Sequence, residues 1–97
     1  MLFAKKLVPL KYEEIINGLK QLGFLMKPKT GTSHEQWVKY SEDRKRKWLV
    51  TVDKHHAPFS RDLIKSMARQ AGVEARSFHA LCRGTATLKQ VVYQTTK

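Results

Sequence analysis

The chain has 97 residues, with 19 Lys or Arg against 8 Asp or Glu and a formal net charge of +11. This length predicts one domain with one modest hydrophobic core, and the charge favours a polyanionic partner, with nucleic acid first. The single cysteine excludes an intrachain disulfide and fits a reducing, cytoplasmic location. The N-terminal residues contain no apolar stretch long enough for a secretory signal or a membrane span.

The first predicted element is a helix that begins at Lys11, after a lead-in over residues 2–10 that we leave unassigned. Acidic residues occupy its first turn, as the helix dipole prefers, and Gly23 suits the left-handed position after its last turn. Apolar residues recur at helical spacing and form one stripe: Tyr12, Ile15, Ile16, Leu19 and Leu22.

Three strands are predicted next, over residues 24–28, 34–40 and 48–52. The first ends at Pro28, which cannot donate a hydrogen bond to a sheet, so we expect this end at the sheet edge. The second alternates with a period of two, and the third is rich in β-branched and aromatic residues. A polar hairpin loop, residues 41–47, joins them, and the short connections make all neighbouring strands antiparallel.

A second helix follows a loop over residues 53–59 that carries two adjacent histidines. Ser60 is a suitable N-cap, and Gly72 closes the helix. The face opposite its apolar stripe carries cations at intervals of four, which we call the basic stripe: Arg61, Lys65 and Arg69. Apolar residues between positions 75 and 82 predict a short third helix, whereas the Thr- and Gln-rich tail, residues 84–97, has no feature that would order it by itself.

These elements predict an α+β fold with the order α-β-β-β-α, a three-stranded antiparallel sheet and helices on one sheet face. We expect a single domain over residues 1–97, with its core in residues 11–83. The other sheet face stays open, and the lysines and arginines around it suit a surface that follows phosphates. An anionic membrane is the competing partner, but both long helices need their apolar faces for the core.

The candidate site is the turn that leads into the second strand. Gly31 permits a tight turn, and the hydroxyls of Thr32 and Ser33 can bond locally or reach a ligand. His34 opens the strand, and histidine is the side chain able to act as a base or an acid near neutral pH. The alternative to a nuclease site is a partly exposed histidine in a basic hairpin.

Four segments of the chain, in this order and at matching spacing, resemble the HicA toxin family: residues 12–24, 31–34, 50–55 and 63–72. The resemblance implies a fold like a double-stranded-RNA-binding domain, cleavage of mRNA and a cognate HicB antitoxin that holds this activity in check. It also implies that His34 occupies the position of the catalytic histidine. Two departures are a Gly-Thr-Ser-His turn one residue longer than the common form, and Asp53 where many members carry proline.

RNA carries its own nucleophile, the 2′-OH, so its cleavage needs only a base, stabilisation of phosphate charge and in-line geometry. We therefore expect no metal and no cofactor. The nearby cations Lys27 and Lys29 suit a phosphate and disfavour a protonated His34, which keeps this histidine available as a base. His55 or a water would serve as the second acid or base, and the sequence leaves that choice open. Further candidates for phosphate binding are Lys54 and the three residues of the basic stripe.

Two further groups of side chains have alternative interpretations. His55 and His56 with Asp53 resemble metal ligands in type, but neighbours on extended chain point to opposite faces and no acidic cluster accompanies them. Three strand aromatics either stack bases on the open sheet face or belong to the core: Trp37, Tyr40 and Trp48.

The interpretation that we favour is a ribonuclease toxin of the HicA type. Its main competitor is a non-catalytic RNA-binding module on the same fold, which differs only in whether His34 does chemistry. A third class is a toxin-derived protein that binds a partner and has lost activity.

Overall fold

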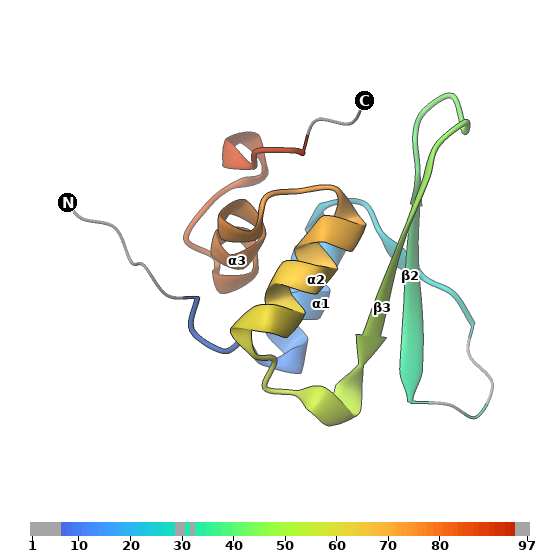
Figure 1. The fold of residues 1–97 in the computed structure, drawn as a ribbon. Helices are drawn as coiled ribbons and strands as arrows, with labels where there is room; N and C mark the ends of the chain where they lie inside the picture. Colours follow the sequence, from blue (N-terminus) through green and yellow to red (C-terminus); the bar gives the residue numbers. More distant parts are fainter. Residues whose placement is uncertain (1–6, 29–30, 32, 95–97) are drawn as a thin grey trace.

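The computed structural model describes residues 7–28, 31 and 33–94. A layer of helices packs on one face of an antiparallel sheet (Figure 1), which confirms the predicted α-β-β-β-α order and fold class. The helices and strands, in chain order, are α1 (Tyr12–Gln21), β1 (Leu25–Met26), β2 (His34–Tyr40), β3 (Lys47–Asp53), the 3-10 turn η1 (Lys54–His56), α2 (Arg61–Ala71), α3 (Ala75–Arg83) and the 3-10 turn η2 (Leu88–Gln90).

The sheet has the order β1-β2-β3, so β2 is its central strand. β2 and β3 pair along their whole length, from His34 opposite Asp53 to Tyr40 opposite Lys47. Asp53 was predicted in the loop, but the pairing continues through it and makes it the last residue of β3. Because strand side chains alternate between faces, the face with His34 looks away from the helices.

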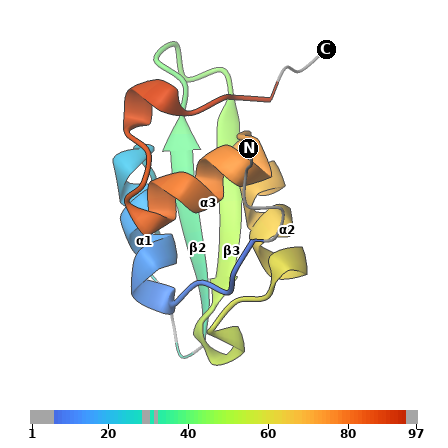
Figure 2. The same cartoon turned by 90° about the vertical axis from the view of Figure 1, so that its left-hand side faces the viewer.

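Figure 2 shows α1 and α2 lying side by side over the sheet, with α3 crossing on their outer side. The core lies between these helices and the inner sheet face, and Trp37 is part of it, with 4% of its surface exposed. Trp48 packs partly buried against this core, whereas Tyr40 is exposed on the outer sheet face. Of the three strand aromatics, the core interpretation is therefore correct for Trp37.

The predicted third helix is present as α3, and the described part of the tail packs against the domain. Val91 is buried, and Val73 pairs with Tyr93 in an isolated antiparallel bridge. The backbone N–H of Gln94 donates to the carbonyl of Gly72 at 2.9 Å. These are mostly backbone hydrogen bonds, which any side chain permits, so the composition of the tail does not reveal them.

The unassigned lead-in ends in a buried residue. Leu10 is fully buried, and its backbone exchanges two hydrogen bonds with Phe59. This pairing ties the start of α1 to the segment that enters α2. Among the described residues, no helix is long and apolar enough to cross a membrane.

Candidate active site

His34 is the first residue of β2, at the end of the sheet where β3 stops. Its side chain is 60% exposed and projects from the sheet face away from the helices. The preceding Gly31 has a φ of 63°, in the left-handed region that favours glycine, as the predicted tight turn requires. Thr32, predicted to shape this turn, and Lys29, predicted to bind phosphate, lie outside the described residues.

Asp53 is the cross-strand partner of His34 and makes the contacts that organise the site. The His34 Nε2 atom lies 3.3 Å from Oδ2 of Asp53, whose side chain is 16% exposed. The other carboxylate oxygen, Oδ1, accepts hydrogen bonds from Ser33 Oγ at 3.3 Å and from the backbone N–H of His55 at 3.0 Å. The N–H of His55, with His34 and His56 nearby, holds the pKa of the Asp53 carboxyl below its usual range, so the group is ionised at neutral pH.

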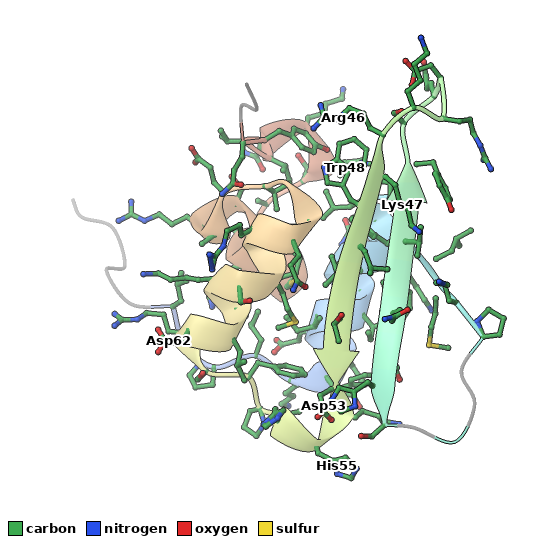
Figure 3. All side chains as sticks on the ribbon, turned by 45° about the vertical axis from the view of Figure 1, so that its right-hand side comes forward. Arg46, Lys47, Trp48, Asp53, His55 and Asp62 are labelled. Carbon is green, nitrogen blue, oxygen red and sulfur yellow. The ribbon has the colours of Figure 1, made fainter. Side chains whose placement is uncertain are left out.

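A second histidine reaches the same carboxylate oxygen. His56 Nε2 lies 3.5 Å from Oδ2 of Asp53, and the His56 side chain is 62% exposed. Asp53 caps η1, and residues three apart in a 3-10 turn lie on the same side, so His56 returns to the carboxylate. The sequence-based candidate for the second acid or base, His55, offers its backbone N–H instead, and Figure 3 shows its ring extending outward from η1.

A hollow between β3 and α2 reaches the Asp53 and His56 side of this cluster, and His34 does not line it. Asp53 and His56 line it together with apolar and polar residues of α2. The backbone N–H of Thr51 donates to Oε1 of Gln70 at 3.0 Å and ties β3 to α2 along the hollow. Its remaining lining residues are Phe59, Leu63, Ser66 and Met67.

The predicted phosphate-binding cations fall into separate groups. The N–H of Lys27 donates to the carbonyl of Gln36 at 2.8 Å, which extends β1 and puts Lys27 on the sheet face of His34. The ammonium of Lys54 lies 5.0 Å from the centre of the Tyr12 ring, and Lys54 belongs to η1 beside Asp53. Lys27 therefore shares the sheet face of His34, whereas Lys54 follows Asp53 in the chain and directs its ammonium to Tyr12 of α1.

The basic stripe on α2 lies apart from His34. Arg61 and Lys65 line a different hollow, with Arg76 of α3 and Glu74, and none of these residues lines the hollow that contains Asp53 and His56. Arg76 was not singled out in the sequence, because only the packing of α3 beside α2 places it near the stripe. Arg69, the last residue of the stripe, is also exposed.

A buried carboxylate lies behind the site on the core side of β2. Glu35 is 2% exposed and accepts hydrogen bonds from the Tyr12 hydroxyl, at 2.8 and 2.6 Å to its two oxygens, and from Trp37 Nε1 at 3.1 Å. Burial and the Glu35 carboxylate raise the pKa of Tyr12 well above its usual value, so the phenol stays a donor. These bonds anchor the residue next to His34 to α1. The feature of the sequence that could have indicated these hydrogen bonds is a glutamate at an inward-facing position of an alternating strand.

Among the residues that the structure describes, no group of three His, Cys, Asp or Glu side chains is arranged to hold a metal ion. Compared with known families, residues 12–73 match the family described as "HicA toxin of bacterial toxin-antitoxin". This match covers His34, Asp53, His56 and the whole of α2, whereas α3 lies beyond it. Comparisons with curated proteins and with solved structures gave no match.

Proposed function

The chain belongs to the HicA toxin family of bacterial toxin–antitoxin systems, and on this premise we propose that it is an endoribonuclease that cleaves mRNA without a metal ion. The observation that carries the proposal is the contact between His34 and the ionised carboxylate of Asp53, on an exposed end of the sheet. An exposed imidazole held by a carboxylate is an arrangement suited to proton transfer, because the carboxylate orients the ring and stabilises its protonated form. The compartment in which this protein meets mRNA is the cytoplasm.

The reaction uses the nucleophile of the RNA itself. His34 takes the proton of a 2′-OH, and the 2′-oxygen attacks the adjacent phosphorus. The bond from phosphorus to the 5′-oxygen breaks as a second acid or a water protonates that oxygen, which leaves a 2′,3′-cyclic phosphate on one product and a 5′-OH on the other. Lys27, on the same sheet face, balances the negative charge that gathers on the phosphate oxygens, and Lys29, which lies outside the described residues, is a further candidate from the sequence.

As a member of this family the protein has an antitoxin partner, and we propose that this partner is of the HicB type. A net charge of +11 favours an acidic inhibitory surface, since complementary charge speeds association and masks the RNA-binding face. The surface would cover His34 and contact the basic stripe on α2.

The test uses an RNA with one mapped cleavage site and the same RNA with a single deoxynucleotide on the 5′ side of that site. The wild-type chain, made by cell-free synthesis, should cut the first RNA in excess EDTA and leave a 2′,3′-cyclic phosphate, and it should spare the second RNA at the mapped position. His34→Ala should abolish cutting. His79→Ala is the matched control, because this histidine lies on α3 and contacts the carbonyl of Val8 at 2.9 Å.

Three outcomes would overturn the proposal. Cutting at the deoxynucleotide, or activity lost in EDTA and restored by Mg²⁺, would replace the 2′-OH mechanism by a metal-dependent one. Tight binding of both RNAs without cutting would favour the non-catalytic RNA-binding module.

A further inference from the structure

We propose that His56 is the second proton-transfer group of this site, the general acid that protonates the departing 5′-oxygen, and that Asp53 positions both histidines. This inference rests on the proposed ribonuclease function and deepens it. It replaces His55, the candidate taken from the sequence, by His56, the histidine that the fold brings to the carboxylate.

The geometry of the carboxylate carries the proposal. The Nε2 atoms of His34 and His56 lie 3.3 and 3.5 Å from the same oxygen of Asp53. The two rings therefore meet at one oxygen atom, and because each turns its Nε2 to the carboxylate, the proton exchanged with the RNA is the one at Nδ1. Both rings are more than half exposed, so an RNA backbone can reach them.

The charge of the cluster favours a division of roles. Asp53 carries one negative charge, which balances one imidazolium, and a second imidazolium beside it would be repelled by the first. One protonated and one neutral imidazole on a shared carboxylate are what concerted acid and base catalysis needs. The α2 side chains that line the hollow beside His56 carry no charge, and among the described residues η1 adds two ionisable neighbours, Lys54 and His55.

The proton balance of the step is complete with this pair. Neutral His34 gains the proton of the 2′-OH as the 2′-oxygen bonds to phosphorus, and protonated His56 gives its proton to the 5′-oxygen as the bond from phosphorus to that oxygen breaks. The protein ends the step with the same number of protons, but they have changed places. Exchange with water restores the starting state, so no co-reactant is needed.

The experiment compares two RNAs that differ in one atom, the bridging 5′-oxygen at the mapped site or a sulfur in its place. A thiolate leaves without being protonated, so a sulfur-linked RNA does not need a general acid. His56→Ala should slow cleavage of the ordinary RNA by about 100-fold or more, and of the sulfur-linked RNA by less than about tenfold. His34→Ala should lose activity on both RNAs, because the base is still required.

His55→Ala is the matched variant, since it removes the neighbouring imidazole and keeps the backbone N–H that Asp53 accepts. It should cost far less than His56→Ala on the ordinary RNA. Equal losses for His56→Ala on both RNAs, no loss at all, or a loss as large for His55→Ala would overturn the inference while the wild-type chain still cuts through the 2′-OH. A wild-type chain that cuts neither RNA would instead overturn the proposed function, and the inference with it. Thermal unfolding of each variant reports whether it is folded.

Discussion

Two aspartates of this chain accept the same kinds of hydrogen bond but have different neighbours. Asp43, in the hairpin between β2 and β3, accepts a hydrogen bond from Ser41 Oγ at 2.6 Å and from the N–H of Lys45 at 3.0 Å. Asp53 likewise accepts from a serine hydroxyl and from the N–H two residues later. Only Asp53 has a histidine as its cross-strand partner, and its serine lies 20 residues away in sequence, so similar hydrogen bonds belong to a candidate site at one position and to a loop at the other.

This pair of aspartates gives a matched experiment. Asp53→Asn keeps one oxygen for the serine and the backbone, but it puts an NH₂ donor where both imidazoles meet an acceptor. We expect RNA cleavage to fall about 100-fold, because the reacting groups lose their orientation. Asp43→Asn should cleave at the wild-type rate. Initial rates on the mapped RNA measure both, and equal rates for the two variants would show that Asp53 does not position the histidines.

At the scale of elements, α1 and α3 lie so close together that the residue of α1 at their contact has no room for a side chain. A Cβ added at Gly18 of α1 would collide with the Sγ of Cys82 on α3. Burial raises the pKa of the Cys82 thiol to about 12, so it packs as a small apolar group and is not a nucleophile. α3 lies beyond the residues matched by the family, and it joins the hydrophobic core through Phe78, Leu81 and Cys82.

Gly18→Ala should therefore destabilise the domain by about 1–3 kcal/mol through overpacking. Helix propensity alone predicts that this substitution stabilises the domain, since alanine is more favourable than glycine inside a helix by about 1 kcal/mol. The double variant Gly18→Ala/Cys82→Ala should recover most of the loss, because it removes the sulfur that the new methyl meets. Denaturant unfolding of the single and double variants measures this coupling, with Asn17→Ala as an exposed control on α1. A stabilised single variant would contradict the packing.

At the scale of the whole molecule, positive charge lies on more than one side of the domain. Lys27 shares the sheet face of His34, whereas Arg61 and Lys65 line a hollow toward α3 together with Arg76. A long RNA that reaches His34 would contact the cations of this hollow only if it also passes α2. We therefore expect the basic stripe to bind RNA apart from the chemistry, since phosphate contacts position a nucleic acid without reading its bases.

The double variant Arg61→Ala/Lys65→Ala tests that separation. We expect KM for a long RNA to rise while kcat stays at the wild-type value, because neither residue approaches the histidines. The binding constant should also depend less on salt. The slope of its logarithm against the logarithm of the salt concentration should become shallower by about 0.7 for each lost phosphate contact to a single strand. Lys89→Ala in η2 removes an exposed cation elsewhere and serves as the control. A fall in kcat with an unchanged KM would instead connect the stripe to the chemistry.

Several features of this protein follow from the sequence alone because their causes are local. The apolar stripes and caps predict α1 and α2, and the alternation over residues 34–40 coincides with β2. Net charge depends on composition only, and the family resemblance rests on short segments read in order. His34 as a candidate also needs nothing beyond its own turn.

The partners of His34 were decided by the tertiary structure. Asp53 faces this histidine because two strands pair in one register, and a shift of one residue would send its side chain to the other sheet face. The choice between His55 and His56 depends on a 3-10 turn, and such a turn is too short to leave a recognisable pattern of residues in the sequence. The buried bonds of Glu35 and the docking of residues 84–94 likewise join segments distant in the chain, and such contacts exist only once the backbone has brought those segments together.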